Sequence, residues 1–299
     1  MSSRQTLSYL IGRFQEAGIH PETRHGQNFL IDLNLLDLLV RTADLGPRDV
    51  VLEVGTGLGS LTWRMAQAAG HVVTVEIDAR LFQLASEELD SLPNVTMLQE
   101  DALRNKNALN PAMLALVREK MAATSGSQFK LLANLPYNIG TPILSNLLTA
   151  DPVPFSLTAT IQKELADRMA ASPGTKDYSA LSVWMQALCD VTIVREMSPQ
   201  VFWPRPKVHS AIVHIVPSAA KRAAIRDVEF FHSFLRTLFS HRRKFLRSGL
   251  ATSYKAELDK PTIDDILASL KFPIDARAEQ LDVPTLIALS DAVQQRISV

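Results

Sequence analysis

Val50-Val-Leu-Glu-Val-Gly55-Thr-Gly57-Leu-Gly59-Ser60 is the stretch that decides the fold of this 299-residue chain. A short apolar run ends there at a glycine-rich turn, and a helical pattern begins at about Ser60 and continues to about Ala69. A strand, a tight turn and a helix make the first half of a βαβ unit. Further short apolar runs follow, separated by helical stretches, at residues 72–77, 95–99, 130–134 and 156–161.

This alternation predicts parallel strands joined by crossover helices. Because the runs are apolar on both faces, we expect helices to cover both sides of the sheet, as in an open, doubly wound, Rossmann-like α/β domain. A ligand then binds at the carboxyl ends of the strands. Two later runs, at residues 191–194 and 211–216, flank a proline-rich loop and predict an antiparallel pair at the edge of the sheet.

Beyond Pro217 the strand pattern ceases, and residues 218–299 predict a small, all-helical second domain. Residues 1–22 contain Leu7, Leu10, Ile11 and Phe14 at helical spacing, which predicts an N-terminal helical appendage to a central domain at residues 23–217. Residues 104–129 predict a helix inserted between the third and fourth strands.

Composition excludes several classes of protein. With 46% hydrophobic residues the chain can bury a sizeable core, and its one cysteine, Cys189, cannot form an internal disulfide. We find no signal-peptide pattern and no run of 18 apolar residues, so we expect a cytoplasmic protein without a membrane span. No cluster of metal ligands is evident; His71, His209 and His214 are interpreted as structural.

The formal net charge of zero conceals a basic segment. Residues 195–247 hold eleven basic and three acidic side chains, whereas residues 1–194 hold fifteen and twenty. The densest part, Arg236–Arg247, contains no carboxylate and interleaves basic residues with phenylalanines, as expected of a helical surface that faces phosphates. A solvated basic face is the alternative interpretation.

The glycine spacing distinguishes between classes of nucleotide site. A dinucleotide fold favours G-x-G-x-x-G, whereas Gly55, Gly57 and Gly59 follow G-x-G-x-G, with Glu53 two places before the first glycine. This loop resembles the methionine-binding loop of class I S-adenosylmethionine-dependent methyltransferases. Glu76 ends the second strand, where a carboxylate can accept both ribose hydroxyls, and Asp101 follows the third, where it can accept the adenine amino group. Either acid alone could be a helix N-cap.

Asn134-Leu-Pro-Tyr137 ends the fourth strand and indicates the reaction. The exocyclic amine of a base is a poor nucleophile because its lone pair is delocalised into the ring. The Asn134 carboxamide oxygen and the Leu135 carbonyl can hold both N–H groups and turn that lone pair outward. Pro136 stiffens the turn, and Tyr137 can stack on the base. An Asx-capped strand-to-helix turn is the alternative.

Together the motifs resemble one family closely, the ribosomal RNA adenine N6-methyltransferases, and within it the small-subunit rRNA adenine dimethyltransferases. The resemblance covers most of the chain and rests on residues 26–30, 53–59, 75–78, 100–102, 134–139, 162–168 and 202–210. It implies dimethylation of two adjacent adenines in a hairpin loop near the 3′ end of small-subunit rRNA. S-adenosylmethionine would be the methyl donor, and an immature 30S particle would be the partner of a monomeric enzyme.

The resemblance also implies roles for single residues. Asn28, Leu30, Gly55, Gly57, Glu76, Asp101 and Asn134 would bind the cofactor. Asn134, Leu135, Pro136 and Tyr137 would hold the target base, with Phe202 as the opposite wall of its pocket unless that ring belongs to the core. Arg242, Arg243, Lys244 and Arg247 would face the rRNA, and such phosphate contacts position without selecting a sequence.

Other functions remain open at this point. A large-subunit rRNA adenine methyltransferase of the macrolide-resistance type would share the cofactor loop and a similar Asn-x-Pro-Tyr turn. A ribosome-assembly factor could act mainly by binding. A DNA amino-methyltransferase would need a target-recognition domain, and a nicotinamide oxidoreductase is disfavoured by the glycine spacing.

Overall fold

A computed structural model describes residues 6–21, 26–241 and 243–297. By packing, the chain divides into two units. The first comprises residues up to Ala166 together with Thr192–Pro217, and the second comprises Asp167–Val191 and Ser218–Val299. No helix among the described residues is long and apolar enough to cross a membrane.

A seven-stranded sheet forms the centre of the first unit, with the order β4-β3-β2-β7-β8-β11-β9. β2, β3, β4, β7 and β8 are parallel, and β11 joins β8 in antiparallel register. The strands are β2 (Val50–Val54), β3 (His71–Glu76), β4 (Val95–Gln99), β7 (Phe129–Asn134), β8 (Ser156–Gln162), β9 (Cys189–Met197) and β11 (Ser210–Pro217). The expected parallel sheet and the two later strands are therefore confirmed.

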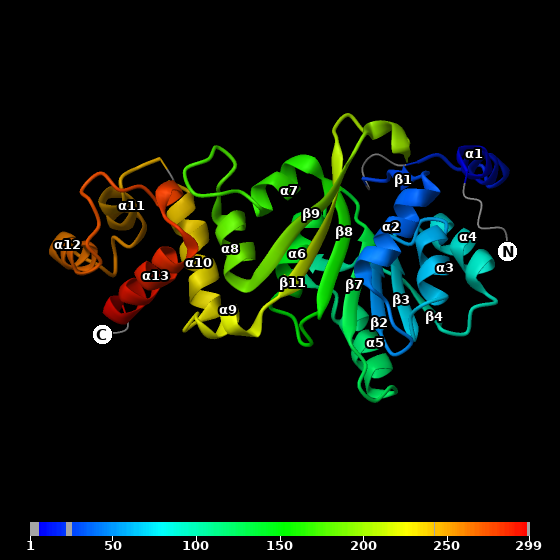
Figure 1. Ribbon diagram of the computed structural model, residues 1–299, viewed down its shortest axis with the longest axis horizontal. Coiled ribbons are helices and arrows are strands. Elements are labelled where there is room, and N and C mark those ends of the chain that lie inside the picture. Colours follow the sequence, from blue (N-terminus) through cyan, green and yellow to red (C-terminus); the bar gives the residue numbers. More distant parts are fainter. Residues whose placement is uncertain (1–5, 22–25, 242, 298–299) are drawn as a thin grey trace. The chain divides into compact units, whose positions relative to one another are not determined.

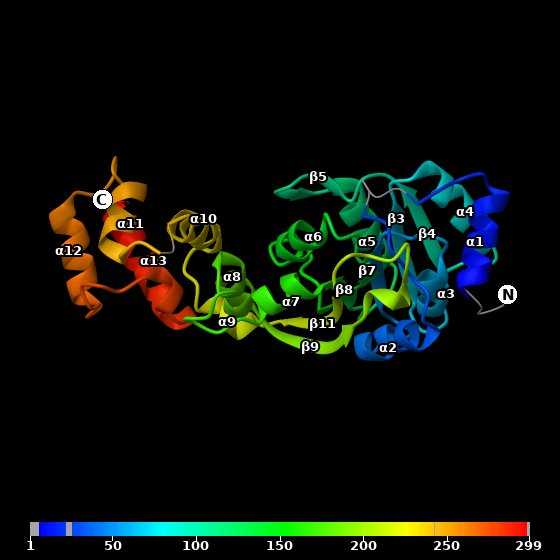
Figure 2. The same ribbon diagram turned by 90° about the horizontal axis from the view of Figure 1, so that it is seen from above.

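Helices cover both faces of this sheet, since the strands are apolar on both sides. α2 (Leu33–Ala43) and α3 (Ser60–Ala66) lie on one face, and α5 (Pro111–Ala122) and α6 (Gly140–Leu147) lie on the other (Figures 1 and 2). Asp32 caps α2 and Asp78 caps α4 (Ala79–Leu89), each by accepting two backbone N–H groups. The helix expected as an insertion is α5. It packs on β2 and β3, so it is the crossover that returns the chain to β7 rather than an addition.

Short elements surround the carboxyl ends of the strands. β1 (Phe29–Leu30) pairs antiparallel with β10 (Phe202–Trp203), and β5 (Leu103–Asn105) pairs with β6 (Ala108–Leu109). A 3-10 turn, η2 (Pro199–Val201), precedes β10. The N-terminal helix α1 (Leu7–Glu16) buries Leu10 and Phe14 against the first unit. α7 (Lys163–Met169) follows β8.

The second unit is helical and larger than expected. Its helices are α8 (Ala180–Leu188), α9 (Ala219–Ala223), α10 (Val228–Phe239), α11 (Leu246–Ser253), α12 (Lys260–Ser269) and α13 (Val283–Ile297), with a 3-10 turn η3 (Ala278–Gln280). The sequence pattern predicted that this domain begins at residue 218. In the structure the second unit also contains residues 167–191, because α8 is apolar on almost every side and packs on α9, α10 and α13.

Candidate functional site

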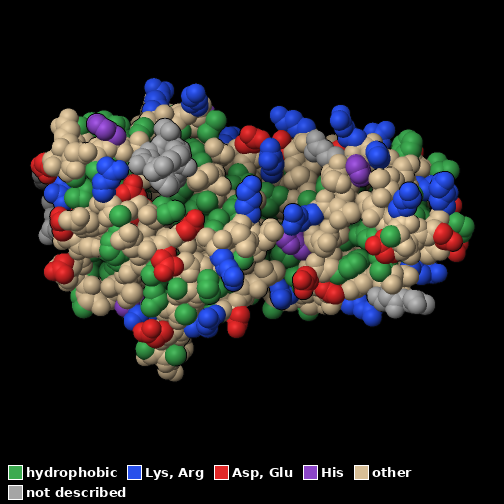
Figure 3. Space-filling view, turned by 180° about the vertical axis from the view of Figure 1, so that it is seen from behind, with side chains coloured by type: hydrophobic (Ala, Val, Ile, Leu, Met, Phe, Trp, Pro, Cys, Tyr) green, Lys and Arg blue, Asp and Glu red, His purple; other side chains and the backbone are tan. Residues whose placement is uncertain are grey.

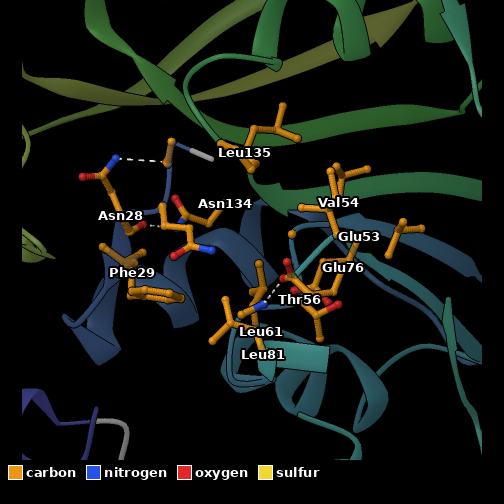
Figure 4. A pocket seen from close by; sticks show the side chains of 18 of the residues that line it. Asn28, Phe29, Glu53, Val54, Thr56, Leu61, Glu76, Leu81, Asn134 and Leu135 are labelled. Atoms are coloured by element: carbon orange, nitrogen blue, oxygen red, sulfur yellow. Dashed lines mark hydrogen bonds between the residues drawn. The ribbon is translucent and has the colours of Figure 1, made fainter. Parts of the chain in front are cut away.

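A cavity of about 240 Å³ lies at the carboxyl ends of β2, β3 and β7. Its walls come mainly from four segments that are distant in the sequence: residues 26–30, the turn after β2, the end of β3 and the turn after β7 (Figure 4). Asp101, which follows β4, also lines it. This is the position at which open α/β sheets bind ligands, because the strand ends and the amino ends of the following helices converge there.

The glycine turn brings backbone to the cavity surface. Gly55 and Gly57 have φ angles of 88° and 59°, in the left-handed region that favours glycine. A Cβ at Gly57 would lie 3.1 Å from Cε1 of Phe29, and one at Gly55 would lie 3.3 Å from Cδ of Pro136. The turn therefore leaves no room for a side chain between it and its neighbours.

Glu76 closes one side of the cavity. The Gly57 N–H donates to its Oε2 at 2.9 Å and the Asp78 N–H donates to its Oε1 at 3.0 Å, which fixes the carboxyl group. Burial raises the pKa of Glu76, since water is excluded from a side chain that is 5% exposed. Each oxygen keeps lone pairs for further donors, so the group fits a vicinal diol.

Asp101 also lines the cavity, and its Oδ1 accepts the Leu103 N–H at 2.9 Å in a local turn. Ile77 follows Glu76 in the chain and also lines the cavity, and it is 46% exposed. An apolar side chain in a cavity that also holds two acceptors suits a flat heterocycle with a donor amine at its edge.

Asn134 contributes a polar side chain to the cavity wall across from Glu76 (Figure 4). Its Nδ2 donates to the Asn28 carbonyl at 2.8 Å, while its Oδ1 is buried and has no hydrogen-bond partner among the described residues. An orphaned buried acceptor costs free energy unless a ligand donates to it. The site therefore lacks one donor at this atom.

Residues 26–30 lie directly over this turn. A Cβ at Gly26 would be 2.8 Å from Oδ1 of Asn138 and 3.0 Å from the Tyr137 nitrogen. Asn28 donates from its Nδ2 to the Gly26 carbonyl at 3.1 Å, and Leu30 is buried at the cavity. The expected cofactor residues Asn28, Leu30, Gly55, Gly57, Glu76, Asp101 and Asn134 all line one cavity.

The expected base-pocket residues divide into two groups. Leu135 and Pro136 line the cavity, whereas Tyr137 does not; its hydroxyl is hydrogen-bonded to Ser210 of β11, and burial raises the pKa of this hydroxyl. Phe202 is 2% exposed and packs with Leu30 and Ile212 in the core. Pairing of β10 with β1 places Phe202 opposite Leu30 in register, and its expected role as the other wall of the base pocket remains a prediction.

Of the basic residues expected to face the rRNA on a helical surface, Arg243 and Lys244 lie in a turn between two helices, whereas Arg247 lies in α11. α10 ends at Phe239 and α11 begins at Leu246, and Arg243 and Lys244 are exposed between them. Arg247 pairs with Asp264 through two hydrogen bonds of 2.5 and 2.7 Å. Arg242 lies outside the described residues. Figure 3 shows Lys and Arg side chains at many places on one face of this unit.

Sequence reasoning gave no role to several residues of the cavity. Phe29, Ile77, Leu58 and Leu81 line it. Glu53, buried behind the glycine turn, accepts from Thr62 Oγ1 at 2.5 Å and Thr74 Oγ1 at 2.7 Å, and burial raises its pKa to about 8. The sequence analysis noted Glu53 as the acid two places before Gly55 but gave it no hydrogen-bond partners. Among the residues that the structure describes, no three His, Cys, Asp or Glu side chains are grouped to hold a metal ion.

Known proteins share this architecture and sequence. The family model described as ribosomal RNA adenine dimethylase matches residues 20–283. Ribosomal RNA small subunit methyltransferase A of Halothermothrix orenii is 37% identical over 276 residues, covering 91% of this chain and 88% of that protein. The protein of the same name from Lactiplantibacillus plantarum is 38% identical, covering 93% and 92%.

Two solved structures are similar in fold. A dimethyladenosine transferase from Plasmodium falciparum has a TM-score of 0.73 at 25% identity, covering 89% of this chain and 97% of that one. The 23S rRNA methyltransferase ErmE has a TM-score of 0.62 at 26% identity, covering 89% and 100%. The fold alone therefore does not separate small-subunit from large-subunit enzymes, whereas the family model and the sequence identities are decisive at the family level: this chain belongs to the ribosomal RNA adenine dimethylase family.

Proposed function

We propose that the cavity binds S-adenosylmethionine and that the chain dimethylates the N6 amines of two adjacent adenines in a hairpin loop near the 3′ end of small-subunit rRNA. Family membership makes the chain an rRNA adenine dimethyltransferase, an enzyme that uses S-adenosylmethionine. The observation that carries the proposal is the buried Oδ1 of Asn134, a residue that lines a cavity suited to a nucleoside; this oxygen lacks a donor among the described residues.

The cavity residues fit the methyl donor part by part. Glu76 is fixed by two backbone N–H groups and can accept both ribose hydroxyls. Asp101 can accept the adenine amine, and Ile77 offers an apolar face to the ring. The turn at Gly55 and Gly57 lets the backbone approach the methionine part, while Asn28 and Leu30 cover it. When bound, this group supplies a methyl on a positively charged sulfur.

The turn after β7 prepares the target amine. Asn134 Oδ1 and the Leu135 carbonyl accept the two N–H groups, which removes the amine lone pair from conjugation with the ring. Pro136 restricts the backbone so that this carbonyl keeps its direction. Tyr137, anchored to Ser210, supplies an aromatic face for the flipped base. Positioning and electrostatics suffice, and the amine proton leaves to water.

The helical unit provides the phosphate-binding surface in this proposal. Arg243 and Lys244 are exposed at the turn between α10 and α11 and can neutralise backbone phosphates. Arg247 already forms a bidentate pair with Asp264, so its contribution is smaller. A monomer acting on an immature 30S particle in the cytoplasm is the setting that we propose.

Mass spectrometry of rRNA from cells with and without the gene tests the substrate. Two adjacent dimethyladenines should disappear from the 3′ region of small-subunit rRNA on deletion. An unchanged small-subunit mark with a lost large-subunit mark would instead support the macrolide-resistance type.

The Asn134→Ala variant tests the site. With unmethylated 30S particles it should lose methyl transfer by about 10²–10³-fold, the usual effect of removing one preorganised hydrogen-bonding group. Near-normal transfer by the variant would refute the role of Oδ1. Restoration of small-subunit assembly by this inactive variant would show that binding outweighs chemistry.

A further inference from the structure

The N-terminal helix α1 is docked on the first unit by polar contacts with α4. Tyr9 donates its hydroxyl proton to Glu88 Oε1 at 2.7 Å. Arg13 Nη2 lies 3.4 Å from Glu87 Oε2 and 3.5 Å from Glu88 Oε1. These partners are more than 70 residues away in the sequence, so the helix is held at a specific place on α4.

The apolar face of α1 belongs to the same cluster as the cavity wall. Leu10 is fully buried and Phe14 is 3% exposed, and they pack with Leu58 and Leu81, which line the cavity. Leu58 and Leu81 therefore belong both to the cluster that holds α1 and to the cavity wall. Undocking α1 would remove part of the packing that supports this wall.

Phe14 makes the most direct connection. Its ring lies edge-on to Phe29 at 5.3 Å and to Trp203 at 5.0 Å between centroids. Phe29 lines the cavity and lies against Gly57, where a Cβ would meet its ring at 3.1 Å. Gly57 in turn donates its N–H to Glu76. A chain of direct contacts thus joins α1 to the carboxylate that fits the ribose.

The same cluster includes the strand pair over the site. Phe29 is the register partner of Trp203, and Leu30 is the partner of Phe202. Phe14 packs on both rings of the first pair and so holds the two short strands together. Two-residue strands have little stability of their own, and packing must fix their position.

We propose that α1 is a positioning element for the cofactor: its docking, through Phe14, holds Phe29 against the glycine turn and thereby sets the affinity for S-adenosylmethionine. Phe14 touches no ligand and acts through Phe29. The inference rests on the cavity being the cofactor site, as proposed above.

Titration calorimetry of the full-length protein with S-adenosylhomocysteine, without RNA, tests this inference. Phe14→Ala should raise the dissociation constant about tenfold, whereas Gln15→Ala on the exposed side of α1 should leave it unchanged. Thermal unfolding of the ligand-free variant, followed by circular dichroism, should remain a single cooperative transition, because the sheet does not depend on α1. An increase of less than threefold in Phe14→Ala overturns the inference.

A second pair of variants avoids the core. Arg13→Glu places a carboxylate beside Glu87 and Glu88 and should weaken cofactor binding severalfold, and adding Glu87→Arg should restore it. If α1 contributed only stability, melting temperatures would change while the dissociation constants stayed constant, and the inference would fail. Absence of any binding by the starting protein would instead refute the proposed cofactor site itself.

Discussion

Replacing Glu76 by Gln removes one of the two oxygen acceptors at the end of β3. In the structure each carboxylate oxygen receives one backbone N–H, from Gly57 at 2.9 Å and from Asp78 at 3.0 Å. A carboxamide has one oxygen and one NH₂ group, so in either orientation an N–H faces another N–H. The variant therefore loses one internal bond and one acceptor for the ribose.

The size of the effect follows from these contacts. A hydrogen bond to a charged group contributes roughly 1.5–3 kcal/mol. The variant loses one hydrogen bond to a ribose hydroxyl and holds the group that makes the second one less firmly. The free energy of cofactor binding should therefore weaken by about 3 kcal/mol, which is roughly 10²-fold in affinity. The ligand-free fold should suffer less, because burial raises the pKa of Glu76 and its charge is already costly to bury.

Isothermal titration with S-adenosylmethionine measures this directly. Glu119→Gln is the matched control, because Glu119 is an exposed acid of α5 that pairs only with the adjacent Lys120 among the described residues. We expect the control to bind as the starting protein does. An affinity of Glu76→Gln within threefold of the starting value would refute the assignment of the ribose to this carboxylate.

Three further predictions concern other parts of the molecule. Gly57→Ala should weaken cofactor binding at least tenfold in calorimetry, because alanine at φ 59° costs about 1–2 kcal/mol and its Cβ would displace the Phe29 ring; a neutral effect would contradict the close packing. Burial raises the pKa of Glu53 in the folded state to about 8 from 4.5, so the folded state binds this proton more tightly than the unfolded state does. Protonated Glu53 therefore contributes fully to stability below pH 4.5, and this contribution is lost as the pH rises through 8. Urea unfolding should therefore show that the free energy of unfolding falls less between pH 5 and 8 in Glu53→Gln than in the starting protein, by an amount on the order of a few kcal/mol. Some pH dependence should remain in the variant, because the pKa of Glu76 is shifted in the same direction. An identical pH dependence in the two proteins would contradict the buried acid. The double variant Arg243→Ala with Lys244→Ala should lower rRNA affinity, and it should reduce the slope of log K against log salt concentration by roughly one to two units. Arg247→Ala should change that slope less, because Asp264 already neutralises the charge of Arg247.

The sheet could be predicted from the sequence because its strands are short runs that are apolar on both faces. Val50–Val54 is buried at every position and begins and ends where its sequence pattern does. The partners of α8 could not be predicted in the same way. Its sequence is apolar on nearly all sides, so periodicity indicates burial without indicating which unit provides it.

That the expected cofactor residues would lie together could be predicted for a related reason. Glycines, an acid at a strand end and the Asn134 turn all follow parallel strands, and the topology brings those ends together. The side on which Phe202 lies depends instead on its pairing with Leu30, which no local pattern encodes. The break between α10 and α11 was missed because residues 240–245 contain neither glycine nor proline; it coincides with a bridge between Phe245 and Arg277.

Asn134 connects the two halves of the proposed reaction through a single carboxamide. Its Nδ2 holds the Asn28 carbonyl, and Asn28 belongs to the segment that covers the cofactor cavity. A planar amide cannot direct its nitrogen to one side without directing its oxygen to the other. Placement of residues 26–30 over the cavity therefore also sets the direction of Oδ1, which we propose accepts from the target amine. Asn134→Asp should accordingly harm both halves at once, because a carboxylate cannot donate to the Asn28 carbonyl and would repel it. Weaker cofactor binding together with slower methyl transfer is the expected result, and unchanged cofactor affinity would show that the two halves are independent.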